Sequence, residues 1–170
     1  MNRVLVKGPP FILLWGERLV MRSQAKQPIL IVEDSPEDFE TTVRGLTKAG
    51  LANPIFHCED GDDALDFLRR QGKYTSAEDA PRPGIILLDL NLPGTDGREV
   101  LAEIKQDSNL KTIPVIVLTT STDERDIETC YQSGANSYVH KPVGMEGFMQ
   151  ALQRLRAYWF EIVVFPKDGG

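Results

Sequence analysis

Three carboxylates, one hydroxyl and one ammonium occur where short apolar runs of the chain end. Glu33 and Asp34 follow the first run, Asp89 the third and Thr119 the fourth, while Lys141 lies just after the fifth. If these runs are parallel strands of one sheet, their carboxyl ends meet at one rim, where such sheets bind ligands. We therefore expect the five side chains to converge at one site.

The carboxylates determine what chemistry this expected site could carry out. Clustered carboxylates repel one another and cannot all stay ionised at neutral pH without a compensating positive charge. Mg²⁺ offers that compensation, because it prefers hard oxygen ligands and keeps waters and phosphate oxygens around it. An aspartate such as Asp89 can attack phosphorus and form an acyl phosphate. Lys141 would then neutralise a phosphoryl oxygen, and the Thr119 hydroxyl would donate a hydrogen bond to it.

The elements that must position these residues alternate along the chain. Short apolar runs predict strands at residues 28–32, 55–58, 84–88, 113–118 and 137–139. Amphipathic stretches of helical length follow the strands, at residues 36–49, 60–71 and 96–106, then after Thr122, and from Gly144 to about Trp159. Residues 72–83 are polar and contain proline, which predicts a loop. Successive βα units predict a doubly wound parallel sheet with helices on both faces.

Several predicted helix ends carry capping signals. Ser35 is expected to cap the first helix, and Gly50 to lie just beyond its last turn. Asp96 and Glu99 form a capping-box pattern at the start of the third helix. Thr122 is expected to cap the fourth helix. These signals place helix boundaries where the hydrophobic pattern also places them.

Four motifs of the chain resemble those of the response-regulator receiver family. They are ILIVEDS at 29–35, LLDLNLPG at 87–94, the pair Leu118-Thr119, and YVHKP at 138–142. The resemblance spans roughly residues 28–156, with the motifs in the family's order and on the expected elements. It implies a flavodoxin-like (βα)5 fold of the α/β class, with a five-stranded parallel sheet in the order 2-1-3-4-5.

The resemblance also implies roles for the acidic residues. Asp89 would be the phosphoacceptor, and Mg²⁺ would be associated with Glu33, Asp34, Asp89 and the backbone carbonyl of Asn91. Many family members carry Asp where this chain has Glu33, so its metal contact could be direct or through water. Taken alone, Asp34 could instead help to cap the first helix beside Ser35.

Two further site residues and a switch residue follow from the same resemblance. Thr119 and Lys141 would contact the phosphoryl group, and the Lys141-Pro142 peptide bond would be cis. Tyr138 resembles the family's aromatic switch, which turns inward once the site is phosphorylated. The alternatives are an ordinary strand residue for Thr119, a solvated side chain for Lys141 and a packed edge-strand aromatic for Tyr138.

Composition argues against several classes of function. The formal net charge of -6 disfavours general nucleic-acid binding, which needs a concentrated basic face. Membrane spanning is not expected, because no apolar run approaches about 20 residues. Cys58 and Cys130 lack CxxC or metal-ligand spacing, which predicts free thiols in a reducing cytoplasm. His57 and His140 are expected to be structural rather than phosphorylated, since a kinase-type histidine would lie on an exposed helix.

Two other functions use related chemistry or the same fold. A haloacid-dehalogenase-type phosphatase also has an Asp nucleophile and Mg²⁺, but it requires a second Asp where this chain has Asn91, and its nucleophile follows the first strand. A flavin-binding flavodoxin-like module needs a phosphate loop after the first strand, where Glu33 and Asp34 would repel a phosphate. We therefore expect a phosphoacceptor signalling protein and not an enzyme.

A closer resemblance, to phytochrome-associated single-domain regulators, rests on the loop at 72–83 and the apolar end of the chain. It implies a phytochrome-type histidine kinase as partner. The expected organisation is a poorly ordered leader at 1–26, a receiver domain at 27–157 and an apolar tail at 158–170. We expect a homodimer through the fourth helix, fifth strand, fifth helix and tail, because exposed apolar patches mark interfaces. Alternatively, the tail folds back onto its own domain.

Overall fold

The computed structural model describes residues 27–166. The expected leader at 1–26 and the end of the tail at 167–170 lie outside the described residues. Within residues 27–166, no helix combines the length and the apolar composition needed to cross a membrane. The fold below therefore concerns the predicted receiver domain and most of the predicted tail.

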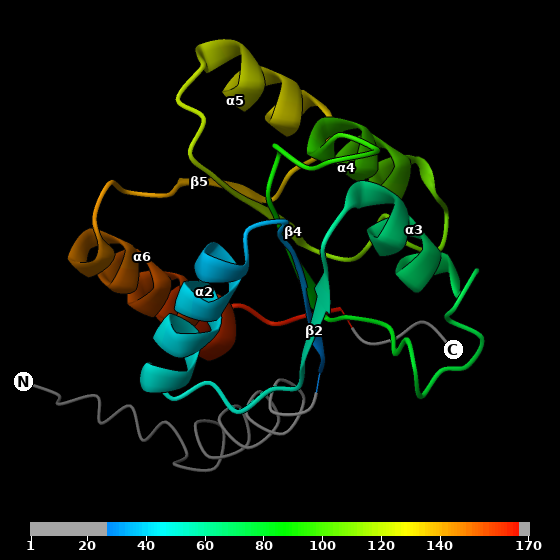
Figure 1. Ribbon diagram of the computed structural model, residues 1–170, viewed down its shortest axis with the longest axis horizontal. Coiled ribbons are helices and arrows are strands. Elements are labelled where there is room, and N and C mark those ends of the chain that lie inside the picture. Colours follow the sequence, from blue (N-terminus) through cyan, green and yellow to red (C-terminus); the bar gives the residue numbers. More distant parts are fainter. Residues whose placement is uncertain (1–26, 167–170) are drawn as a thin grey trace, which may run out of the picture.

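Five parallel strands form one sheet at the centre of the fold (Figure 1). They are β1 (Ile29–Val32), β2 (Ile55–Cys58), β3 (Ile85–Leu88), β4 (Val115–Thr119) and β5 (Ser137–His140). Their order is β2-β1-β3-β4-β5, and every neighbouring pair is parallel. The predicted fold class and strand order are confirmed. From β1 the chain proceeds to β2 on one side, and from β3 it proceeds to β4 and β5 on the other, so the strand order reverses between β1 and β3. In such sheets ligands bind at the carboxyl ends of the strands beside this reversal.

Helices cover both faces of the sheet (Figure 1). On one face α2 (Pro36–Lys48) packs against α6 (Met145–Ala157). On the other, α4 (Gly97–Gln106) packs between α3 (Gly61–Arg69) and α5 (Glu124–Gln132). This is the two-sided covering that the alternation of strands and helices predicts.

β1 and β3 are buried on both faces, which explains their uninterrupted apolar sequences, whereas the edge strands β2 and β5 are mostly half-buried and include polar residues. Alternate side chains of β1 and β3 belong to two separate hydrophobic cores. The core under α3, α4 and α5 contains Leu30, Val32, Ile86 and Leu88. The core under α2 and α6 contains Ile29, Ile31, Ile85 and Leu87. The period of two follows from the pleat of the strands.

Most of the capping predictions agree with the structure. The Ser35 hydroxyl accepts a hydrogen bond from the Asp38 N–H at 3.3 Å, and Asp96 caps α4 through the Arg98 N–H at 2.8 Å. The prediction for Thr122 is wrong, because Asp123 caps α5 by accepting from the Arg125 N–H at 2.9 Å. A carboxylate at this end also complements the helix dipole, which favours aspartate as the cap.

The tail divides between the domain core and the surface. It begins with a π-helix, η1 (Tyr158–Ile162). Trp159 and Phe165 are buried in the core under α2 and α6, with their rings stacked 6.3 Å apart. Ile162 and Val164 remain 69% and 65% exposed. Part of the tail therefore folds back onto its own domain, and its other apolar residues stay at the surface.

Candidate functional site

The carboxyl ends of β1 and β3 bring the predicted acidic residues together. Val32 and Leu88 are paired at the ends of these strands, and the Asp89 N–H donates to the Val32 carbonyl at 3.0 Å. One carboxylate oxygen each from Glu33, Asp34 and Asp89 lies within 4.8 Å of the other two. Glu33 and Asp89 are buried, whereas Asp34 is exposed. The clustering that the sequence predicts is thus present.

Lys141 extends from the end of β5 into this cluster and is itself buried. Its ammonium Nζ lies 2.5 Å from Glu33 Oε2, 2.8 Å from Asp89 Oδ2 and 2.9 Å from Asp38 Oδ2. The Lys141 N–H also donates to the Thr119 carbonyl at 2.7 Å, which anchors its backbone to the end of β4. Lys141 is therefore a paired internal cation, and the alternative of a solvated side chain does not hold.

The peptide bond between Lys141 and Pro142 is trans, like every peptide bond among residues 27–166. The cis bond implied by the family resemblance is therefore not found. The trans form is the intrinsically favoured one for bonds to proline. From a trans bond the Lys141 side chain still reaches the three carboxylates.

Burial and charge act in opposite directions on the groups of this site. Burial raises the pKa of Glu33, and the hydrogen bond from Lys141 only partly offsets this. Burial alone would lower the pKa of Lys141, but its hydrogen bonds with Asp89 and Glu33 reverse that effect and raise the pKa. The ammonium is therefore charged at neutral pH, and it is the main neutralising group that the protein supplies.

Glu33 is held by further contacts. Its carboxylate Oε1 accepts a hydrogen bond from the Ser35 N–H at 3.2 Å. Its backbone carbonyl is 2.8 Å from His57 Nε2, and the His57 ring stacks on Phe39 at 3.7 Å. His140 Nε2 makes a comparable contact with the Thr120 carbonyl at 3.2 Å. Both histidines bond to backbone carbonyls, as the expectation of structural roles requires.

The loop after β3 positions the Asp89 carboxylate. Asp89 Oδ1 accepts a hydrogen bond from the Asn91 N–H at 3.2 Å, and the Gly97 N–H donates to the Leu90 carbonyl at 3.0 Å. A Cβ atom at Gly97 would lie 2.1 Å from the Asp89 backbone oxygen, so the first turn of α4 fits closely under the loop only because residue 97 is glycine. This packing fixes the backbone on which Asp89 and Asn91 sit.

The donor set is suited to a divalent metal ion. Three carboxylates at one rim supply hard oxygen ligands, which Mg²⁺, Mn²⁺ and Ca²⁺ all accept. Lys141 provides only one positive charge among them, so the cluster keeps an excess of negative charge. A divalent cation would balance that excess.

The predicted switch residues lie beside the same rim. Thr119 is fully buried at the end of β4, and its hydroxyl accepts a hydrogen bond from the Ser121 N–H at 3.3 Å. The Tyr138 hydroxyl donates to the Ser121 carbonyl at 3.0 Å, and its ring packs on the core under α3, α4 and α5. Thr119 and Tyr138 thus contact the same residue of the β4–α5 loop.

Sequence reasoning missed two groups of residues near the site. Asp38, on the first turn of α2, contacts Lys141, although nothing in its spacing pointed to β5. Arg98 of α4 forms a two-pronged ion pair with Asp126 of α5, at 2.7 and 2.6 Å, and Asp126 also accepts from the Ser121 hydroxyl at 2.6 Å. Both contacts join elements far apart in sequence, so neither leaves a local signal.

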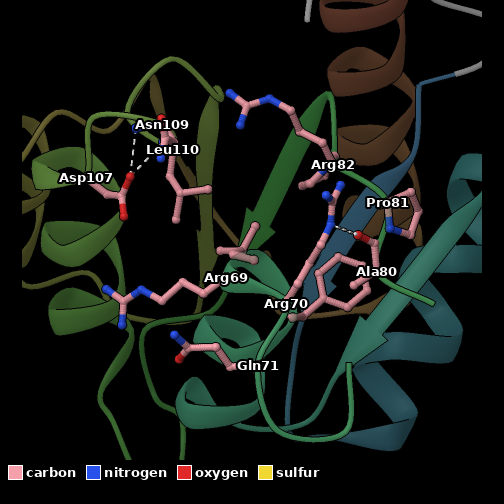
Figure 2. Close-up of a pocket in the computed structure, with 12 residues that line it drawn as sticks. Arg69, Arg70, Gln71, Ala80, Pro81, Arg82, Asp107, Asn109 and Leu110 are labelled. Atoms are coloured by element: carbon pink, nitrogen blue, oxygen red, sulfur yellow. Dashed lines mark hydrogen bonds between the residues drawn. The ribbon is translucent and has the colours of Figure 1, made fainter. Parts of the chain in front are cut away.

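A cavity of about 820 Å³ lies at the other end of the sheet (Figure 2). It is lined by the carboxyl-terminal ends of α3 and α4 and by the chain before β3, and it includes Arg69, Arg70 and Arg82. Arg69 is already paired with Glu103 at 2.5 Å, and Arg70 Nε donates to the Ala80 carbonyl at 3.1 Å. None of the predicted site residues lines this cavity, so we assign the site to the acidic rim.

A response regulator receiver domain model matches residues 29–153, so the chain belongs to this family of signalling proteins. The chain is similar to the response regulator Rcp1 of Synechocystis sp., with 42% identity over 144 residues, 85% of this chain and 96% of Rcp1. The crystal structure of Mn²⁺-bound Rcp1 has a TM-score of 0.78 and covers 83% of this chain and 99% of its own.

The phosphorylated cyanobacterial phytochrome response regulator RcpA gives the same TM-score of 0.78, at 38% identity over 84% of this chain and 99% of its own. These matches confirm the predicted receiver family and the resemblance to phytochrome-associated regulators. They do not support the phosphatase or flavin-binding alternatives. Asp89 follows β3 rather than β1, and the loop after β1 carries Glu33 and Asp34 where a flavin phosphate would bind.

Proposed function

We propose that this chain is a phosphorelay response regulator whose Asp89 accepts a phosphoryl group from a histidine kinase. The contact between the buried Asp89 carboxylate and the Lys141 ammonium, 2.8 Å apart, is the observation that carries the proposal. It joins a nucleophile to a fixed positive charge at the rim where parallel sheets bind ligands. The chain is then a phosphoacceptor, and its only catalysis is its own phosphorylation and dephosphorylation.

We propose Mg²⁺ as the cofactor of this reaction. Glu33, Asp34, Asp89 and the backbone carbonyl of Asn91 would hold it, since all four supply hard oxygen ligands. The ion would supply positive charge to the phosphoryl oxygens when bound. Glu33 is fixed by Lys141, Ser35 and His57, whereas the exposed Asp34 can adjust to the ion.

The proposed response to phosphorylation passes through Thr119. Its hydroxyl would donate to a phosphoryl oxygen, and Ser121, whose N–H it now contacts, would move with it. Tyr138 would follow, because its hydroxyl bonds to the carbonyl of the same serine. The β4–α5 loop is therefore the proposed switch, and protein–protein contact the proposed output.

The proposed kinase is of the phytochrome type. This rests on the similarity to RcpA, which is named as a cyanobacterial phytochrome response regulator. Direct transfer to Asp89 is expected, since the described residues contain no phosphohistidine helix. A cytoplasmic location is part of the proposal and fits the two cysteines, which are buried and free.

A homodimer is also proposed, through α5, β5, α6 and the tail. Tyr131 on α5 and Tyr158, Ile162 and Val164 of the tail are exposed by half or more, which is the kind of apolar surface that two-fold pairing covers. Ile162→Asp should yield monomer in sedimentation while leaving the buried Trp159 in place. A wild type that sediments as monomer at high concentration, with or without phosphate, would contradict the dimer.

The test of the phosphoacceptor is Asp89→Asn. This variant should fold as the wild type does, yet take no label from acetyl phosphate or from a kinase, and removing Mg²⁺ from the wild type should have the same effect. Lys141→Ala should impair labelling, and Thr119→Ala should permit labelling but weaken the conformational response. Label on the Asn variant would refute the assignment of Asp89.

The test of the partner is transfer from a phytochrome-type kinase under two light conditions. Label should appear on the wild type and not on Asp89→Asn, with a rate that light alters. Transfer from an unrelated histidine kinase alone would remove the phytochrome partner and retain the phosphoacceptor.

A further inference from the structure

We propose that Asp38 is a positioning residue that occupies a hydrogen-bond donor of Lys141 and so slows phosphorylation until a phosphoryl oxygen displaces it. The inference rests on the proposed function of Asp89. Asp38 is not part of the acidic cluster formed by Glu33, Asp34 and Asp89. It reaches Lys141 from the first turn of α2, at 2.9 Å.

The first step of the argument is that Lys141 has no donor to spare. A lysine ammonium carries three N–H donors and no acceptor. Carboxylates of Glu33, Asp89 and Asp38 lie 2.5, 2.8 and 2.9 Å from its nitrogen. A phosphoryl oxygen that is to be neutralised by Lys141 must therefore take the place of one of these carboxylates.

The second step compares the three carboxylates by burial. The side chains of Glu33 and Asp89 are 4% and 8% exposed, whereas that of Asp38 is 41% exposed. Releasing the buried Glu33 carboxylate would leave a charge without water or partner, which is costly, and Asp89 must stay in place as the attacking group. Asp38, once released, is hydrated at once. It is thus the partner that leaves with the smallest free-energy cost.

The third step is that Asp38 can move without disturbing the fold. Its backbone N–H donates to the Ser35 hydroxyl, which caps the helix, so the Asp38 carboxylate takes no part in the cap. A change of side-chain rotamer therefore frees Lys141 while α2 stays in place. An acidic side chain in the first turn is also favourable to the helix dipole in either rotamer.

The fourth step concerns charge during transfer. The Asp89 oxygen forms a bond to phosphorus as the bond between phosphorus and the donor's leaving group breaks, and the electron pair departs with that group. Asp38 supplies no proton or electron. Its negative charge repels the incoming phosphoryl group and competes with it for Lys141. Both effects oppose phosphorylation, so losing the Asp38 carboxylate should accelerate it.

The experiment compares Asp38→Ala with Glu37→Ala, both in the full chain with Mg²⁺ and acetyl phosphate. Glu37 is exposed and lies on the same first turn of α2. Replacing it with alanine therefore removes one negative charge from that turn, as Asp38→Ala does, but leaves Lys141 with its three carboxylates. We expect Asp38→Ala to be labelled about three- to tenfold faster than the wild type, from the loss of one charge near the phosphoryl group. Glu37→Ala should be labelled at the wild-type rate, and Asp38→Glu should restore slow labelling.

A second measurement requires neither metal nor phosphate. The ammonium protons of Lys141, followed by NMR of ¹⁵N-labelled protein, should exchange with water faster in Asp38→Ala than in the wild type or Glu37→Ala. The inference would be overturned if the Lys141 ammonium protons of Asp38→Ala exchanged at the wild-type rate. It would also be overturned if the wild type were phosphorylated by acetyl phosphate and Asp38→Ala were phosphorylated no faster. A wild type that takes no label at all would instead overturn the proposed function of Asp89.

Discussion

Replacing Lys141 with alanine would take the cation away from two buried carboxylates at once. Glu33 and Asp89 each lose a contact of 2.8 Å or less, and neither is exposed enough to be fully hydrated in its place. Removing one partner of a buried ion pair costs about 3–5 kcal/mol. We expect about 3 kcal/mol for Lys141→Ala without metal, because Asp34 and Asp38 beside the pair are open to water.

The cost should depend on pH in a definite direction. In the wild type, burial already raises the pKa of Glu33 above its ordinary value of 4.5, and Lys141 opposes this rise. Without Lys141 the folded-state pKa of Glu33 is raised further. When the pKa of a carboxyl group is higher in the folded state than in the unfolded state, proton binding stabilises the folded state at low pH. This stabilisation is fully present below the unfolded-state pKa and is lost as pH rises through the folded-state pKa. The destabilisation by Lys141→Ala should therefore be larger at pH 8 than at pH 5.

Urea unfolding followed by circular dichroism, with EDTA at pH 5 and pH 8, measures this free energy of unfolding. Lys73→Ala is the matched control, because Lys73 pairs with Asp63 at 2.8 Å but is 67% exposed, and its loss should have no measurable effect. Added Mg²⁺ should restore part of the stability of Lys141→Ala. A loss below about 1 kcal/mol, the range of surface pairs, or one equal at both pH values, would refute the reasoning.

Three further predictions test the surroundings of the site. Gly97→Ala should lower the free energy of unfolding by about 1–3 kcal/mol, because its Cβ would meet the Asp89 backbone oxygen; wild-type stability in urea would contradict this. Tyr138→Phe should lose about 1 kcal/mol through its missing hydrogen bond to Ser121, yet still be labelled by acetyl phosphate. Burial raises the pKa of Cys58 to about 12, so this thiol should react with a thiol reagent only after unfolding, and fast reaction of the native protein would show that it is accessible.

Local signals along the chain were sufficient for most of the fold. The apolar runs that became β1 and β3 are buried on both faces, so sequence and structure carry the same information there. Ser35 and Asp96 cap their helices as predicted, since a cap depends on neighbouring residues alone. Thr122 was misassigned because Asp123, next to it, is also a capping residue, and its carboxylate suits the helix dipole better than a threonine hydroxyl does.

The tail shows where local signals are insufficient. Its apolar residues suggested a surface for a partner, but Trp159 and Phe165 fill the core under α2 and α6 while Ile162 remains exposed. The hydrophobicity of a residue indicates that it tends to be buried, but it does not indicate whether the residue is buried in its own domain or at an interface with a partner. Only the tertiary structure separates the two groups, because it places Trp159 and Phe165 in the core under α2 and α6 and leaves Ile162 and Val164 at the surface.

The sequence by itself determined the rim where Glu33, Asp34, Asp89 and Lys141 meet, because each of these residues ends or follows a strand and parallel strands end at one rim. The family and the strand order came from the resemblance of its motifs to the receiver family. The tertiary structure alone decided that Asp38 also contacts Lys141 and that the carboxylates differ in burial. Contacts between residues more than a hundred positions apart depend on how helices pack on the sheet, and no local pattern of residue types records that packing.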